Sequence, residues 1–137
     1  MLSARSFQLY GAEPSSTLVS KFKQRLPGVH VRCEAFEDSN FFGNRFDGAL
    51  AIGLMFMLKP DDQRKLIQKT ANALKPSTGF FFTAPYQICQ WEDLLTGRRS
   101  QFLGREGYIH IAKDARLRLI DMHEDAGENH YFEMKKL

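Results

Sequence analysis

The sequence predicts an α/β fold in which a mostly parallel sheet, flanked by helices, ends in an antiparallel hairpin. Short apolar runs alternate with stretches whose apolar residues recur at helical spacing. Residues 46–53 are apolar almost without interruption, which is typical of a strand covered on both faces of a parallel sheet. The last two strand-like segments have no helix between them, so we expect them to pair antiparallel.

The first part of the chain predicts a strand, a turn, a helix and a second strand. Residues 7–10 alternate apolar and polar side chains, and residues 13–16 supply turn and helix-capping chemistry. From Thr17 to Leu26 the apolar residues recur at helical spacing, until Pro27 and Gly28 end the helix. A second strand is expected over residues 30–34, followed by an acidic and aromatic loop without regular structure over residues 36–44.

The middle of the chain predicts another helix between two apolar strands. A helix begins near Lys59 and Pro60, because proline and acidic residues suit the first helical turn. Its apolar face ends at Leu74, and residues 76–79 are expected to break the helix before a strand over residues 80–85.

The last third of the chain predicts irregular structure, a short helix and a hairpin. Residues 86–104 show poor periodicity, and a short helix is expected around Tyr108 and Ile111. Residues 117–122 and 130–134 alternate as strands on either side of a polar turn. We interpret the polar segment from Asp125 to Tyr131 as a hairpin turn in preference to a binding motif.

Composition favours one domain over residues 1–137. Of the 137 residues, 43% are hydrophobic and 12% aromatic, which is enough for a core. The formal net charge of +3 is mild and the basic residues are scattered, so no nucleic-acid partner is expected. No apolar run approaches the ~20 residues that span a bilayer, and the two cysteines lack disulfide or zinc spacing. These features predict a soluble cytoplasmic protein with reduced, buried thiols.

The reactive side chains form no recognisable metal or nucleophile motif. The four histidines lack helical two-His spacing and have no neighbouring cysteine, so no metal site is predicted. Neither cysteine lies in a motif that would supply a base for nucleophilic catalysis.

Four segments, in order and over almost the whole chain, resemble the motifs of class I S-adenosylmethionine-dependent methyltransferases. They cover residues 9–15, 33–38, 45–53 and 73–82, although Ser77 and Thr78 stand where the family has a double glycine. The resemblance implies a Rossmann-like sheet and S-adenosylmethionine as the cofactor. It assigns Glu13 to the ribose hydroxyls, and Phe36 and Glu37, with Asp38 as an alternative, to adenine. Residues of the fourth family strand would border the methionine end of the cofactor: Ala51, Ile52, Gly53 and Leu54.

The family's first strand and glycine-rich loop have no counterpart before Phe7. The resemblance therefore implies a partial domain that begins at the end of the family's first helix. In the family's strand order the absent strand is central, so the second and fourth strands would each lose a neighbour. Strands with unpaired edges favour pairing with another chain, and self-association is expected.

The function implied by the resemblance is methyl transfer to a small-molecule acceptor, impaired because the glycine loop is missing. No catalytic residue is assigned, because alignment of an acceptor with the activated sulfonium supplies most of the catalysis. Phe56, Tyr86 and Trp91 are candidate substrate contacts, although core packing explains these aromatic residues equally well. The alternative is a noncatalytic methyltransferase-like interaction module that a partner chain completes.

Overall fold

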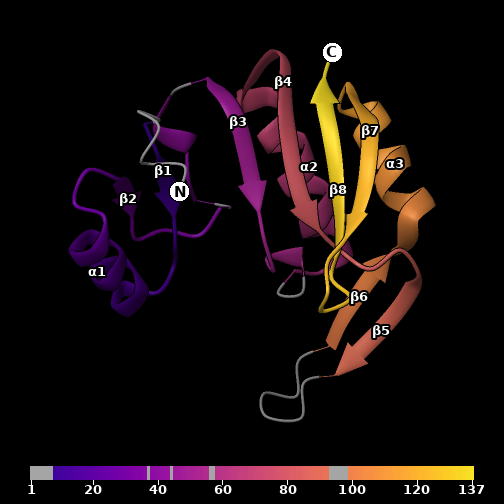
Figure 1. Cartoon of the computed structure of the whole chain (residues 1–137), viewed down its shortest axis with the longest axis horizontal. Helices are drawn as coiled ribbons and strands as arrows, with labels where there is room; N and C mark the ends of the chain where they lie inside the picture. Colours follow the sequence, from indigo (N-terminus) through magenta and orange to yellow (C-terminus); the bar gives the residue numbers. More distant parts are fainter. Residues whose placement is uncertain (1–7, 37, 44, 56–57, 93–98) are drawn as a thin grey trace. The chain divides into compact units, whose positions relative to one another are not determined.

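The computed structural model describes residues 8–36, 38–43, 45–55, 58–92 and 99–137. The chain forms two compact units, Met1–Asn44 and Arg45–Leu137 (Figure 1). The single domain that we expected over residues 1–137 stays a prediction. None of the described helices is both long enough and apolar enough to cross a membrane.

The first unit is a small β-α-β arrangement. It contains β1 (Tyr10–Ala12), α1 (Ser16–Arg25), β2 (His30–Arg32) and the short 3-10 helix η2 (Phe41–Gly43), and β1 pairs with β2 in parallel. The side chain of Ser15 caps α1 by accepting a hydrogen bond from the Leu18 amide at 3.3 Å. The strand expected over residues 7–10 begins only at Tyr10 and extends to Ala12. The second strand, expected over residues 30–34, already ends at Arg32.

Aromatic contacts hold the first unit together. The rings of Tyr10 and His30 stack across the paired strands with centroids 4.7 Å apart, and Phe42 meets Tyr10 edge-on at 5.0 Å. The guanidinium of Arg32 lies 4.4 Å from the Phe42 ring centroid, a cation–π contact. Cys33 is exposed, so the expectation that it is buried was wrong.

The second unit contains a four-stranded mixed sheet in the order β3-β4-β8-β7. Its elements in chain order are β3 (Phe46–Ala51), α2 (Pro60–Ala73), β4 (Leu74–Thr83), β5 (Ile88–Glu92), β6 (Arg99–Leu103), α3 (Gly104–Asp114), β7 (Leu117–Glu124) and β8 (His130–Lys136). Strands β3 and β4 are parallel, and β8 pairs antiparallel with both β4 and β7. The parallel pairs and the C-terminal antiparallel hairpin confirm the predicted fold class.

The core of the second unit lies between one face of this sheet and its helices. Phe82 stacks on Phe132 of the neighbouring strand, with centroids 5.0 Å apart, and both rings contact Tyr108 of α3. Helices α2 and α3 lie on the same side of the sheet (Figure 1). Because side chains alternate along a strand, Phe81 and Tyr131 lie on the opposite face, where their rings stack at 5.2 Å.

The boundary between α2 and β4 differs from the expected one. Strand β4 begins at Leu74, directly after the helix, and the expected break at residues 76–79 lies inside the strand. The pairing with β3 jumps from Phe46↔Leu74 to Gly48↔Gly79, so the extra residues form a bulge in which Ser77 adopts a φ of 68°. Leu74 belongs to β4, and the expectation that it ends the helix face was wrong.

The expected cover on both faces of β3 was also wrong. Leu50 keeps 61% of its surface exposed, so one face of β3 is not covered there. Among the described residues β3 pairs only with β4 and therefore lies at an edge of its sheet. A long apolar run shows only that a segment can be buried, whereas its position in the sheet decides whether it is.

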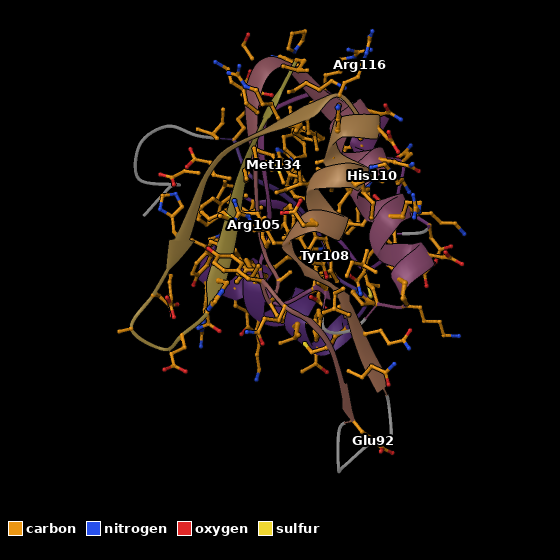
Figure 2. The ribbon with its side chains drawn as sticks, turned by 90° about the vertical axis from the view of Figure 1, so that its right-hand side faces the viewer. Glu92, Arg105, Tyr108, His110, Arg116 and Met134 are labelled. Atoms are coloured by element: carbon orange, nitrogen blue, oxygen red, sulfur yellow. The ribbon has the colours of Figure 1, made fainter. Side chains whose placement is uncertain are left out.

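The stretch that we expected to be irregular contains an antiparallel hairpin, β5–β6. Ile88 pairs with Leu103 at its base and Glu92 with Arg99 toward its far end. The hairpin projects from the rest of the second unit, with Glu92 near its outer end (Figure 2). Its strands carry no regular apolar alternation, so periodicity could not reveal them.

Candidate functional site

The carboxyl ends of β1 and β2 carry two of the residues predicted for the cofactor. Glu13 directly follows β1, its amide donates to the Arg32 carbonyl at 3.1 Å, and its Oε1 accepts a hydrogen bond from the Ser15 amide at 3.0 Å. Phe36 follows β2 and is only 8% exposed. Parallel strands end at the same edge of a sheet, so both residues lie at the carboxyl edge of the first unit. Glu37 lies outside the described residues.

The carboxyl end of β3 holds the other predicted cofactor residues. Ala51 is the last residue of β3 and is 7% exposed, whereas Ile52 is 57% exposed. Gly53 adopts a φ of 73°, where glycine is favoured, and its amide donates to Thr83 Oγ1 at 2.7 Å. Leu54 is half-buried. The hydrogen bond joins the segment after β3 to the end of the neighbouring parallel strand β4.

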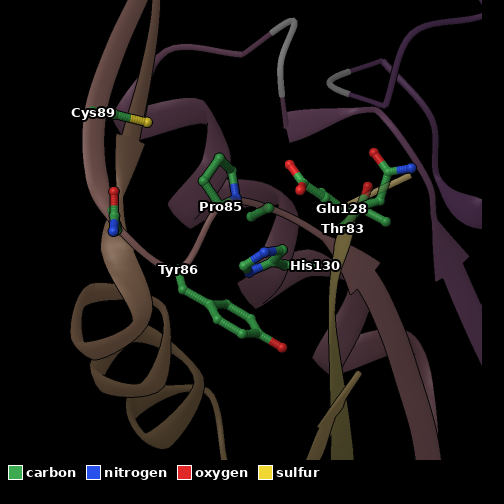
Figure 3. A pocket seen from close by; sticks show the side chains of 9 residues that line it. Thr83, Pro85, Tyr86, Cys89, Glu128 and His130 are labelled. Carbon is green, nitrogen blue, oxygen red and sulfur yellow. The ribbon is translucent and has the colours of Figure 1, made fainter. Parts of the chain in front are cut away.

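A pocket of ≈ 400 Å³ opens at the carboxyl end of β4 (Figure 3). It lies between this strand end, the start of β5 and the turn from β7 to β8. Its lining residues are Thr83, Ala84, Pro85, Tyr86, Gln87, Cys89, Glu128, Asn129 and His130. Tyr86 was predicted as a substrate contact, and the other lining residues were not. The sequence signal that could have revealed them is the polar segment around Glu128. This segment forms the expected turn and also lines the pocket.

Tyr86 and His130 face each other in this pocket. Their ring centroids are 3.9 Å apart and the rings meet edge to face at 68°. The Tyr86 hydroxyl donates to the His123 carbonyl at 3.1 Å, and burial, with a smaller effect of nearby Glu124, raises the pKa of Tyr86. His130 Nε2 lies 3.5 Å from Glu124 Oε1, while its Nδ1 is buried and has no hydrogen-bond partner among the described residues.

Asp125 organises the turn that carries Glu128, Asn129 and His130. Its carboxylate accepts hydrogen bonds from the Gly127 amide at 2.9 Å, the Asn129 amide at 3.0 Å and the Tyr131 hydroxyl at 2.6 Å. These bonds, the one from Tyr131 above all, lower the pKa of Asp125 to about 2. Glu128 sits in the left-handed region with a φ of 63°, a conformation that a non-glycine residue adopts only when its surroundings enforce it.

Residues 1–77 match the family model of the methyltransferase domain. The chain belongs to this methyltransferase family. The sequence has no significant match among curated proteins.

Solved structures of methyltransferases resemble the chain over nearly its whole length. An S-adenosylmethionine-dependent methyltransferase from Methanosarcina mazei has a TM-score of 0.74 at 14% identity, over 99% of this chain and 85% of the other. The CcbJ methyltransferase from Streptomyces caelestis has a TM-score of 0.77 at 14% identity, over 99% and 82%. The 1,6-didemethyltoxoflavin-N1-methyltransferase from Burkholderia thailandensis has a TM-score of 0.69 at 14% identity, over 98% and 74%. At these identities the likeness shows the fold, which is the Rossmann-like methyltransferase fold.

Two further predicted substrate contacts cannot be placed in the pocket of this methyltransferase domain. Phe56 lies outside the described residues. Trp91 belongs to β5, where its backbone pairs with Ser100, and its side chain is outside the described part of the chain.

One group of side chains in the described part of the chain could hold a metal ion, on the sheet face opposite the helices. Asp121, His123 and Glu133 each place one ligand atom within 4.8 Å of the others. His123 Nε2 lies 2.9 Å from Glu133 Oε2, and this hydrogen bond raises the pKa of His123. His123 and Glu133 form an ion pair between the neighbouring strands β7 and β8, and a metal ion would have to displace the proton that this pair holds.

Proposed function

We propose that this methyltransferase domain transfers a methyl group from S-adenosylmethionine to a small-molecule acceptor bound in the pocket of Figure 3. The hydrogen bond from Gly53 to Thr83 carries the proposal, because it connects the segment after β3 to a residue that lines the pocket. In open α/β sheets, ligands bind beyond the carboxyl ends of the parallel strands. The resemblance to the family supports a methionine end of the cofactor along the same segment.

The resemblance assigns residues of both units to the cofactor. In the first unit, Glu13 uses Oε1 for the Ser15 amide, and a carboxylate has acceptor capacity left for a ribose diol. Phe36 and Glu37 would contact adenine. In the second unit, residues 51–54 would border the methionine moiety. The Burkholderia thailandensis structure contains S-adenosylhomocysteine, and a glycopeptide N-methyltransferase with 12% identity contains S-adenosylmethionine.

The chain's own contribution to the reaction would be positioning. The bound cofactor supplies a sulfonium that already activates the methyl group, so the protein needs mainly to align the acceptor and exclude water. Tyr86, fixed through its hydroxyl to the His123 carbonyl, offers one rigid wall for this purpose. Thr83, at the end of β4, holds the backbone of Gly53, which follows the end of β3.

Cofactor binding and methyl transfer test the proposal separately. Isothermal titration with S-adenosylmethionine and S-adenosylhomocysteine should give saturable binding to the full chain. A labelled methyl group should then pass from S-adenosylmethionine to a member of a small-molecule panel. We expect this transfer to be slow, because the sequence lacks the family's glycine-rich loop. Absence of binding by both cofactor forms would refute the proposal.

The second candidate function is a noncatalytic module whose sheet a partner strand extends. The exposed edge favours it: among the described strands β3 pairs on one side only, and Leu50 and Ile52 next to that edge are 61% and 57% exposed. Light scattering over a range of concentrations tests whether the partner is a second copy. A module of this kind would bind neither cofactor form, whereas the enzyme would bind the cofactor.

A further inference from the structure

We infer that the pocket at the end of β4 selects an acceptor that carries a hydrogen-bond donor and no negative charge, and that His130 and Glu128 are the residues that select it. This inference rests on the proposed methyl transfer and specifies its substrate class. Three properties of the pocket support it: its charge, an unpaired nitrogen atom and its apolar wall.

The charges around the pocket favour neutral or cationic ligands. Among the described residues that line the pocket, Glu128 is the single acidic one and none is a lysine or arginine. The turn fixes Glu128 there, because its amide donates to the Asp125 carbonyl at 3.1 Å and Asp125 is itself held by three neighbours in the turn. Arg105 carries a positive charge near Tyr86, to whose carbonyl its backbone amide donates at 2.8 Å, but it is not among the described lining residues. An anionic acceptor would meet the Glu128 carboxylate without a lining cation to compensate.

His130 offers the pocket a hydrogen-bond acceptor. When Nε2 carries the proton and donates toward Glu124, Nδ1 keeps a lone pair. That atom has no partner among the described residues, and a buried polar atom without a partner is costly. The side chain is 27% exposed and lines the pocket. A turn of the ring about its Cβ–Cγ bond releases the 3.5 Å contact with Glu124 and presents Nδ1 to a ligand. A donor such as O–H or N–H would satisfy it.

Part of the remaining lining is apolar and fits a small ring, beside the polar side chains of Thr83, Gln87 and Asn129. Ala84, Pro85 and the Tyr86 ring lie on this side of the pocket. A volume of ≈ 400 Å³ lies at the small end of ligand pockets, which is suited to a compact molecule. An acceptor with an apolar ring and one donor group would use both walls.

Four probes of similar size test this selectivity without the cofactor. They are benzyl alcohol, benzylamine, benzoate and toluene, each titrated into the full chain while NMR follows the signals of Asn129 and His130. Benzyl alcohol and benzylamine should bind, benzoate at least tenfold more weakly and toluene at least threefold more weakly. Equal binding of benzoate, or no binding by any of the four, would overturn the inference.

Variants connect the preference to the two named residues. His130→Phe should remove the preference for benzyl alcohol over toluene, His130→Gln should keep part of it, and Glu128→Gln should weaken benzylamine alone. The matched control is His110→Phe, since His110 forms a similar pair with Asp114 at 3.6 Å on α3 and does not line the pocket. A preference unchanged in both His130→Phe and Glu128→Gln would refute the assignment. Because no cofactor is present, this result is independent of the titration that tests methyl transfer.

Discussion

The hydroxyl of Tyr108 donates a hydrogen bond to Gln63 Oε1 over 2.6 Å, and both side chains are completely buried. The amide of Gln63 donates in turn to the carbonyls of Leu58 at 3.0 Å and Gln101 at 2.6 Å. This polar network joins α2, α3 and the second strand of the β5–β6 hairpin inside an otherwise apolar core. Burial raises the pKa of Tyr108 to about 12, so the phenol remains a donor at physiological pH.

Tyr108→Phe should therefore destabilise the domain by about 1–3 kcal/mol, because it leaves the buried Gln63 oxygen without its donor. Urea unfolding followed by circular dichroism measures the change. Tyr86→Phe is the matched control, since the Tyr86 hydroxyl donates in an exposed position and its loss should cost about 0.5–1 kcal/mol. Equal effects of the two variants would contradict the importance of the buried network.

Gly104→Ala should loosen the junction between the β5–β6 hairpin and α3. Gly104 adopts a φ of 75°, and a Cβ there would approach Ile88 Cγ1 to 2.8 Å and the Ile88 amide nitrogen to 3.0 Å. We expect a loss of about 1–3 kcal/mol, from a left-handed backbone and a close contact together. Gly28→Ala is the control, because nothing lies within 4 Å of its added Cβ. Thermal unfolding of both variants measures the difference, and equal midpoints would show that the junction tolerates a side chain.

The Asp125 turn should weaken in acid. The folded pKa of about 2 lies below the ordinary value of 3.8, so the turn's contribution to stability is complete above about pH 4 and disappears as the pH falls toward about 2. Asp125→Asn should therefore flatten the dependence of the urea midpoint on pH between these limits. Tyr131→Phe, which removes the largest cause of the shift, should flatten it partly. The same slope in all three proteins would disprove this explanation.

Glu13→Ala should weaken the binding of S-adenosylmethionine more than Glu13→Gln. Both changes remove the charge that suits a ribose diol, at a typical cost of about 1.5–3 kcal/mol for a charge-assisted hydrogen bond. Glutamine keeps an oxygen that can accept from the Ser15 amide, so it preserves the turn before α1. Isothermal titration measures both affinities. An affinity that neither change alters would refute the ribose assignment.

Sequence reasoning succeeded where local chemistry decides the structure. Proline and two acidic residues place the start of α2 at Pro60, and Ser15 caps α1 one residue before its first turn. Sequence reasoning failed where pairing with a distant strand decides whether a strand forms and where it begins. Strand β4 starts at Leu74 because a bulge lets it pair with β3, and the β5–β6 hairpin exists through its own cross-strand pairing without an apolar pattern.

By itself the sequence determined the fold class and the order of the elements outside the β5–β6 hairpin, because these follow from short-range periodicity and turn chemistry. Only the tertiary structure decided that Tyr86 and His130 share a pocket. Their meeting depends on the antiparallel register of β4 and β8, which pairs Thr83 with Tyr131 and lets the Ala84 amide donate to the His130 carbonyl at 3.2 Å. That register depends on a long-range interaction, because it is set by which faces of two distant strands are buried together. Local sequence does not encode it.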